Sequence, residues 1–191
     1  MKDFDDIQTL LKEDLAQTDV LLHSRLSSNV ALINQVSSYI ISAGGKRLRP
    51  LLLLLCARAN HYQGEHHRLM AVVIELIHTA TLLHDDIVDE SSTRRGKNTA
   101  NEVWGNAASV LVGDFLYSRS FEMMVEPGSM KIMQILSKAT NEIAQGEVLQ
   151  LLNCKNSTLT QDEYYQVIER KTAVLFQAAT QIGGILSKVN N

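Results

Sequence analysis

Hydrophobic residues recur along most of this chain with the spacing of a helix rather than that of a strand. Between residues 66 and 90, apolar and small side chains follow one another at intervals of three and four: Leu69, Val72, Val73, Leu76, Thr79, Ala80 and Leu83. This spacing places them on one face of an α-helix. No stretch alternates apolar and polar residues between turn signals, so strands are not expected. The pattern predicts an all-α protein.

The same periodicity predicts seven helices. They span residues 4–25, 29–42, 48–60, 66–90, 98–125, 129–153 and 160–187. Thr160 followed by Glu163 has the sequence of a capping box, which should begin the last helix. An asparagine pair at 190–191, an ordinary helix stop, closes the chain. We expect residues 1–191 to form a single all-helical domain of stacked antiparallel helices.

Composition and charge exclude several classes of protein. The net charge of −3 over 191 residues gives no reason to expect nucleic-acid binding. The N-terminal stretch MKDFDDIQTLLKEDL is acidic and amphipathic, unlike a signal peptide. The most apolar stretch, residues 51–57, is far shorter than the ~20 residues of a membrane span. Cys56 and Cys154, far apart and outside any CxxC pattern, are typical of a reduced compartment, so a cytoplasmic protein is expected.

Three aspartates end the helix predicted at 66–90. Asp85 and Asp89 are four residues apart and share a helix face, whereas Asp86 lies to one side. Like charges at this spacing repel, and acidic residues at a helix C-terminus oppose its dipole. Carboxylate oxygens suit Mg²⁺, which commonly bridges one or two carboxylates to substrate phosphates. We therefore expect Asp85 and Asp89 to bind Mg²⁺; a solvated acidic helix end is the alternative.

A basic stretch, GGKRLRP at residues 44–50, begins an earlier predicted helix. It places Lys46, Arg47 and Arg49 at a helix N-terminus, where free N–H groups and the dipole already favour anions. Cations there are unfavourable unless an anion neutralises them. A phosphate site accounts for the stretch better than a basic surface loop does.

Further basic residues lie near the aspartates. Arg94 and Arg95 follow them closely in sequence, and arginine binds phosphate in a bidentate manner that lysine cannot match. His78 lies two helical turns before Asp85 on the same face. Alone it would be typical of a core histidine, but beside a phosphate site it is a candidate anion partner. His84 faces another way and is expected to be structural.

These motifs resemble those of a known family. DDIVDESSTRRG is similar to the first aspartate-rich motif of the trans-prenyltransferases (polyprenyl diphosphate synthases), and GGKRLRP is similar to another of their N-terminal signatures. The stretches HTATLLHDDIVDE, NAASVLVGDFLYSRSF and GEVLQL are most similar to the bacterial members that form octaprenyl chains. The resemblance covers nearly the whole chain. It implies an antiparallel helical bundle of the isoprenoid synthase type around a central cavity, usually in a homodimer.

The resemblance also implies a reaction. Isopentenyl diphosphate units are condensed onto an allylic diphosphate, and Mg²⁺ draws the diphosphate leaving group from the allylic carbon. The carbocation that results needs a dry, apolar cavity. The expected product is a long polyprenyl diphosphate, of eight isoprene units by likeness, for quinone side chains. A soluble enzyme would deliver this product to a membrane.

By position, the motif residues take the family's roles. The carboxylates Asp85 and Asp89 are assigned to Mg²⁺ with Asp86 in support, and together with Arg94 and Arg95 they form the catalytic set. The isopentenyl diphosphate is assigned to Lys46, Arg49, His78 and Arg95. The allylic diphosphate is assigned to Arg94, Lys171 and Thr172.

The resemblance also implies that side chains near the aspartates set the length of the product. Ala80 and Thr81, five and four residues before Asp85, are small, so a growing chain is expected to pass them. Met124 and Leu136 are candidates for a deeper floor of the cavity; the alternative is that both are simply core residues.

The chain departs from the family in one respect, because no second aspartate-rich motif follows the first. We therefore expect the N-terminal part of a longer enzyme, without the helices that would complete the cavity. The alternative is a truncated diphosphate-binding chain or partner subunit that does not sustain chain elongation alone.

Two rival classes share part of the pattern. A metal-dependent phosphohydrolase of the HD type would use the pair His84-Asp85 with an upstream histidine, His61, His66 or His67, but leaves GGKRLRP unexplained. A terpene cyclase shares the first aspartate motif, but it binds one diphosphate and has no need of the set Lys46, Arg49 and His78.

Overall fold

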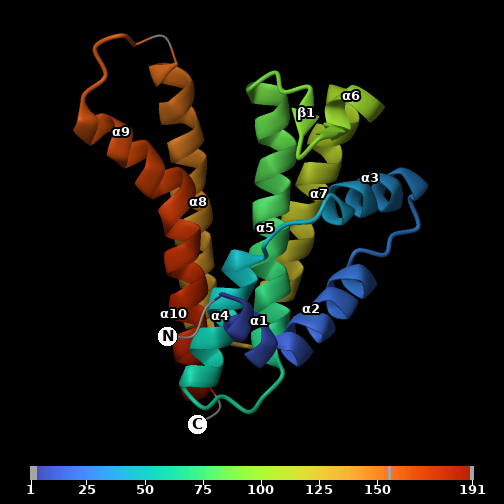
Figure 1. Cartoon of the computed structure of the whole chain (residues 1–191), viewed down its shortest axis with the longest axis vertical. Coiled ribbons are helices and arrows are strands. Elements are labelled where there is room, and N and C mark those ends of the chain that lie inside the picture. Colours follow the sequence, from blue (N-terminus) through green and yellow to red (C-terminus); the bar gives the residue numbers. More distant parts are fainter. Residues whose placement is uncertain (1–3, 155, 190–191) are drawn as a thin grey trace.

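The computed structural model describes residues 4–154 and 156–189, and the asparagine pair at 190–191 lies outside this part. Nearly all of it is helical (Figure 1). The elements are α1 (Phe4–Leu10), α2 (Lys12–Arg25), α3 (Ala31–Ser42), α4 (Leu48–Ala59), α5 (His66–Val88), β1 (Thr93–Arg94), β2 (Lys97–Asn98), α6 (Ala100–Trp104), α7 (Asn106–Met124), α8 (Met130–Asn153), α9 (Gln161–Ile168), a π-helical turn η1 (Glu169–Ala173) and α10 (Val174–Val189). The all-α architecture predicted from the sequence is confirmed.

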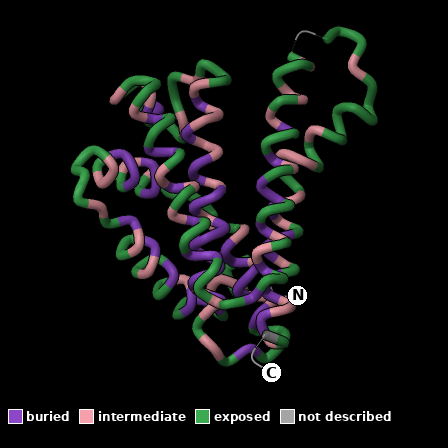
Figure 2. The backbone as a smooth tube through the Cα atoms, turned by 180° about the vertical axis from the view of Figure 1, so that it is seen from behind, coloured by how far each residue is buried: buried purple, intermediate pink, exposed green. Residues whose placement is uncertain are grey.

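Helix α5 is the central element of the fold. It packs mainly against α7, α4 and α2, while α10 runs along α4. The seven α5 residues that recur at spacings of three and four are all buried. Helices α8, α9 and α10 lie on one side of α5, with α2 and α3 on the other (Figure 1). Buried residues gather where α4, α5 and α10 meet (Figure 2), so this junction is the core. In the described residues, no helix is long and apolar enough to cross a membrane.

Helices α4 and α10 pack closely because α10 carries a glycine at their contact. A Cβ atom at Gly183 would collide with the carbonyl oxygen of Leu53 and lie 2.7 Å from the Cβ of Cys56. The next residue, Gly184, faces open space, and a Cβ there would approach only Asn60, at 3.9 Å. A side chain at position 183 would therefore collide with α4, whereas a side chain at position 184 of the same helix would meet open space.

This contrast predicts opposite effects for the same substitution. Gly183→Ala should destabilise the protein by about 2 kcal/mol, because the new methyl group forces two helix backbones apart. Gly184→Ala should stabilise it by roughly 0.5–1 kcal/mol, because alanine favours the helix more than glycine does. Urea denaturation followed by circular dichroism measures both changes. Equal effects at the two positions would show that α4 and α10 do not pack as described.

Two of the predicted helices are interrupted. The helix predicted at 4–25 breaks at Leu11, whose side chain is buried in the core (1% exposed). The helix predicted at 98–125 begins later and breaks at Gly105, whose φ of 83° is outside the helical region. Glycine adopts this conformation at little cost. The helix predicted at 160–187 contains a π-helical turn, and the capping box of Thr160 and Glu163 at its start is confirmed.

The prediction that strands are absent is wrong in one place. Strands β1 and β2 form a short antiparallel hairpin after α5. Its turn residues, Arg95 and Gly96, both have positive φ values, 52° and 77°. Turns of this kind match the twist of paired strands and favour glycine. The hairpin directs the arginines of residues 94 and 95 back toward α5, which the sequence pattern did not show.

A buried ion cluster ties α2 to α4 and α5. Asp14 is 2% exposed and accepts hydrogen bonds from Arg58 Nε at 2.7 Å and Arg68 Nε at 3.0 Å. His67 Nε2 lies 3.0 Å from Asp14 Oδ1, and burial lowers the pKa of His67. The other ring nitrogen, Nδ1, is buried and meets no donor among the described residues. This fits a neutral imidazole whose Nε2–H donates to Asp14.

Candidate active site

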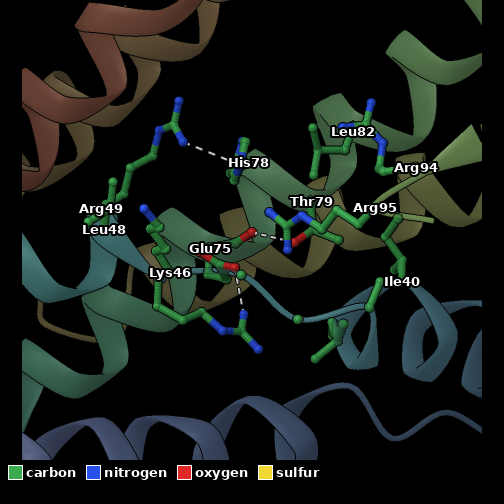
Figure 3. A pocket seen from close by; sticks show the side chains of 15 residues that line it. Ile40, Lys46, Leu48, Arg49, Glu75, His78, Thr79, Leu82, Arg94 and Arg95 are labelled. Carbon is green, nitrogen blue, oxygen red and sulfur yellow. Dashed lines mark hydrogen bonds and ion pairs between the residues drawn. The ribbon is translucent and has the colours of Figure 1, made fainter. Parts of the chain in front are cut away.

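The basic residues of the sequence motifs meet in one pocket. It lies between the start of α4, the middle of α5 and the hairpin, and has a volume of about 390 Å³. Figure 3 shows Lys46 reaching it from the loop before α4, Arg49 from α4, His78 from α5, and Arg95 from the hairpin. The structure thus brings together four residues expected to bind one diphosphate.

The loop before α4 shapes this pocket. A Cβ atom at Gly45 would lie 2.5 Å from Nη1 of Arg95, so the absence of a side chain lets the guanidinium lie against the backbone. Arg47 adopts a left-handed conformation (φ 49°), which directs its side chain to Glu75, 2.5 Å away. Arg47 therefore holds the loop on α5 through an ion pair, a role that the sequence did not indicate.

His78 is uncharged at neutral pH. Its Nε2 lies 3.3 Å from Nη1 of Arg49, whose guanidinium stacks over the ring of Phe176 at 4.3 Å. Burial lowers the pKa of His78 to about 3, with a further contribution from the nearby arginines. A neutral Nε2 accepts the hydrogen bond of Arg49, so Nδ1 carries the proton. The positive charge of the pocket comes from its lysine and arginines. Among the described residues, no carboxylate forms an ion pair with Arg49, although Glu75 is near enough to act on its charge. This arrangement favours a bound anion.

Asp86 and Arg94 form a tight pair at the end of α5. Arg94 Nη2 donates to Asp86 Oδ1 at 2.7 Å, and Nε lies 3.0 Å from both carboxylate oxygens. Asp86 is 2% exposed. Because arginine satisfies this carboxylate, Asp86 positions Arg94 at the rim of the basic pocket rather than facing a metal ion. The expected role of Asp86 in support of the metal ligands stays a prediction.

Asp85 faces a different group of residues. Lys171 Nζ, from η1, lies 3.5 Å from Asp85 Oδ2 and 2.6 Å from Glu147 Oε2 on α8. Burial raises the pKa of both carboxyl groups, although the charge of Lys171 opposes this. Asp89, at the end of α5, is exposed and accepts a hydrogen bond from Gln150 at 3.4 Å. Thr172 is exposed beside Lys171.

Glu147 is a site residue that sequence reasoning missed. Its neighbour Gly146 lies against η1, and a Cβ there would be 2.8 Å from the backbone nitrogen of Lys171. The pair Gly-Glu in GEVLQL therefore marks the place where α8 and η1 meet. A glycine followed by a carboxylate inside a long helix was the available signal, but periodicity alone does not reveal the partner.

The carboxylates supply part of the ligands that a magnesium ion needs. Within the described residues, no three histidine, cysteine or acidic side chains converge as a ready-made metal site. Asp85 and Asp89 supply two oxygen ligands, the number that Mg²⁺ commonly takes from a protein when phosphates and water supply the rest. Glu147 Oε1 is buried beside them, and no donor reaches it in the described part of the chain. A nearby cation is therefore favourable.

The HD-type alternative is wrong for this geometry. His66 and His67 lie at the N-terminal end of α5 and His61 precedes that helix, whereas His84 lies near its C-terminal end. At ~1.5 Å per residue, His66 and His84 are about 27 Å apart along the helix. His84 instead contacts α7, with Nε2 3.3 Å from the Val110 carbonyl oxygen, which agrees with the structural role expected for it.

An apolar cavity of about 390 Å³ opens beside Asp85, between α5, α7 and α8. Thr81 and Tyr117 lie on its wall, and Ile143 adds to its apolar lining. The other residues expected to set product length are not on this wall. Ala80, Met124 and Leu136 are buried in the core, each 2% exposed or less.

Comparison with known proteins identifies the family of this chain. The family model described as polyprenyl synthetase matches residues 30–191. The chain is 52% identical over 181 residues to octaprenyl diphosphate synthase of Escherichia coli, covering 95% of this chain and 56% of that protein. It is 45% identical to an all-trans-nonaprenyl-diphosphate synthase of Rhodobacter capsulatus, with 95% and 56% covered. The chain thus spans about 56% of the length of these curated relatives.

Solved structures give the same result. A decaprenyl diphosphate synthase from Rhodobacter capsulatus superimposes with a TM-score of 0.94 at 51% identity, covering 96% of this chain and 57% of that one. A polyprenyl synthase from Caulobacter crescentus, complexed with calcium and isoprenyl diphosphate, gives 0.95 at 46% identity, with 97% and 57% covered. The fold is therefore of the isoprenoid synthase type, and the chain belongs to the polyprenyl synthetase family.

Proposed function

We propose that this chain is part of a long-chain trans-prenyltransferase that condenses isopentenyl diphosphate onto an allylic diphosphate. One observation carries the proposal: a pocket of arginines and a lysine around a neutral histidine lies close to paired carboxylates and an apolar cavity. Such a site holds an anionic head group and an apolar chain at the same time. Neither a nucleic-acid site nor a simple phosphatase needs both.

The contacts support the following roles, which are part of the proposal. Lys46, Arg49 and Arg95 bind the diphosphate of isopentenyl diphosphate, and His78 adds a neutral Nδ1–H donor. Arg94, oriented by Asp86, and Lys171 with Thr172 bind the allylic diphosphate. Asp85 and Asp89 would hold Mg²⁺, which supplies electrostatic stabilisation of the departing diphosphate. The apolar cavity beside Thr81 accepts the growing chain and excludes water from its reactive end.

The relatives support a long-chain product. Those described above are synthases of octaprenyl, nonaprenyl and decaprenyl diphosphates. We propose a product of eight isoprene units for quinone side chains, made in the cytoplasm by a homodimer and delivered to a membrane. The relative from Caulobacter crescentus, solved with calcium and isoprenyl diphosphate, supports a divalent ion at the site, for which we propose Mg²⁺.

A second candidate function is diphosphate binding without sustained turnover by this chain alone. It is favoured by the single group of carboxylates at the site, because the described residues provide no further metal cluster opposite Asp85. Calorimetry with Mg²⁺ and inorganic pyrophosphate tests binding, and incorporation of labelled isopentenyl diphosphate onto farnesyl diphosphate tests turnover. Binding with little incorporation supports this second function, and steady incorporation contradicts it. Failure to bind pyrophosphate would overturn both functions.

The position of Thr81 leads to a prediction about chain length. Thr81→Phe should weaken binding of a 20-carbon allylic diphosphate about tenfold, because the ring fills space that about two CH₂ groups would occupy. Binding of inorganic pyrophosphate should not change. Competition against labelled pyrophosphate measures both affinities. Thr81→Val, which keeps the volume, is the control and should retain the 20-carbon ligand. If Thr81→Phe also retains it, the cavity beside Asp85 does not hold the chain.

A further inference from the structure

We propose that Lys171 is a displaceable counter-ion, held by Glu147 beside Asp85, which a divalent cation must displace before it can bind Asp85. Glu147 is then a positioning residue. It keeps the ammonium group at the site after the metal ion has taken its place on Asp85. The inference rests on the proposed function, since it assigns the metal and diphosphate to this site.

The contacts of Lys171 carry the argument. Its ammonium lies between two carboxylates, 2.6 Å from Glu147 and 3.5 Å from Asp85. The side chains are largely buried, with exposed fractions of 20% for Lys171, 27% for Glu147 and 14% for Asp85. Charges removed from water interact more strongly than charges on a surface. The ammonium therefore lies beside the carboxylate that a metal ion would contact, and the two cations would compete for it.

The backbone of Lys171 is fixed, so the side chain is the part that can move. The close contact of η1 with Gly146 fixes the backbone at residue 171. The preceding residue, Arg170, is anchored to α8 by a hydrogen bond to Gln145 Oε1 at 2.6 Å and an ion pair with Glu142 at 3.7 Å. Short π-helical segments often occur at functional sites. Here the π-helical turn η1 places the long, rotatable side chain of Lys171 opposite the carboxylates of Asp85 and Glu147.

The balance of charge favours an exchange over a permanent ion pair. Asp85, Asp89 and Glu147 supply three negative charges, and Lys171 supplies one positive charge. A divalent ion on Asp85 and Asp89 would repel the ammonium. The shorter contact to Glu147 would then retain Lys171 at the rim, where it can contact a diphosphate. Without Glu147, nothing in these contacts would keep the ammonium at the rim once the metal ion was bound.

The test is the affinity of the chain for Mg²⁺ alone, measured by calorimetry in the absence of pyrophosphate. Lys171→Met should bind Mg²⁺ about tenfold more tightly than the unmodified chain, because a competing charge a few ångströms away is removed. Its affinity for pyrophosphate with Mg²⁺ present should fall. Mg²⁺ should also raise the melting temperature of the variant more than that of the unmodified chain. The double variant Lys171→Met, Glu147→Gln should lose most of the gain.

Lys138→Met, on the exposed face of α8, is the matched control. It changes the net charge equally and should leave Mg²⁺ affinity unchanged. A lysine that serves only to bind diphosphate or to support the fold would give Mg²⁺ affinity that is unchanged or lower in Lys171→Met, and that result would overturn the inference. If Lys171→Met does not fold, Lys171→Arg serves in its place. It keeps the positive charge, so its affinity for Mg²⁺ should not rise. Tighter binding of Mg²⁺ by Lys171→Arg would also overturn the inference.

The same titrations separate this inference from the proposed function. If the unmodified chain binds pyrophosphate with Mg²⁺ but Lys171→Met gains no Mg²⁺ affinity, only the counter-ion role is wrong. If neither protein binds pyrophosphate with Mg²⁺, the proposed function fails and the inference fails with it.

Discussion

Replacing Asp85 with asparagine should lower the Mg²⁺-dependent affinity for inorganic pyrophosphate by at least ~100-fold. Changes to residues that merely support metal ligands typically cost 10–100-fold, and Asp85 is expected to be a ligand itself. An asparagine keeps the size of the side chain but removes the charge that attracts the metal ion. Calorimetric titration of pyrophosphate at fixed Mg²⁺, with and without a chelator, measures the effect.

The same substitution should not weaken the fold. Burial raises the pKa of Asp85 above its usual value near 3.8. A carboxyl group whose pKa is higher in the folded state disfavours folding once it is ionised, above about pH 4. Removal of this charge should therefore leave stability at pH 7 unchanged or slightly higher. A loss of affinity without a loss of stability is typical of residues kept for function.

Asp114→Asn is the matched control for this experiment. Asp114 lies on the wall of the same apolar cavity, but its side chain is 62% exposed, and its Oδ1 lies 3.4 Å from Nε2 of His84. The substitution removes the same charge from the same region and should change pyrophosphate affinity less than threefold. A similar loss in both variants would mean that net charge, not coordination, controls binding, and the metal assignment would be wrong.

The sequence predicted the long helices well because each buries one continuous face. The recurrence along α5 is the clearest case, since every residue of that pattern is buried. It did not predict the breaks, because these depend on single residues. The φ of Gly105 and the burial of Leu11 arise from packing between distant segments. The helical spacing of apolar residues in the sequence does not predict such breaks. The two-residue strands were missed because they are far shorter than any alternating pattern.

The charged residues of the site were predicted from their types and spacing, but their pairing was not. Asp85 and Asp86 are neighbours in the sequence, yet one faces Lys171 and the other binds Arg94. Successive helix positions point about 100° apart, so adjacent carboxylates meet different partners. Which partner each meets depends on the hairpin, which carries Arg94, and on η1, which carries Lys171. Local patterns do not specify such contacts.

Replacing Asp14 with asparagine should destabilise the protein by roughly 3 kcal/mol at pH 7, because breaking a buried ion pair leaves its partners uncompensated. This aspartate holds two arginines and His67 within hydrogen-bond distance, across three helices. Both arginines remain partly exposed, so solvent reduces the penalty. Urea denaturation of both proteins measures the difference. Asp19→Asn on the same helix is the control, because that side chain is 57% exposed and 3.7 Å from Arg47. It should cost less than ~1 kcal/mol.

Acid should weaken the folded protein through the same cluster in two stages. Burial lowers the pKa of His67 below 6.5, so its neutral form favours folding, and this stability is lost as the pH falls from about 6.5 toward the lower folded value. Hydrogen bonds from the arginines and His67 outweigh burial and hold the pKa of Asp14 well below 3.8. The contribution of Asp14 to stability is therefore fully present above about pH 4 and is lost as the pH falls further.

Denaturation midpoints measured between pH 7 and pH 3 should fall in both pH ranges, and Asp14→Asn should abolish the decrease in the lower range. A midpoint in Asp14→Asn that falls below pH 4 as steeply as in the unmodified chain would show that other carboxylates cause acid unfolding.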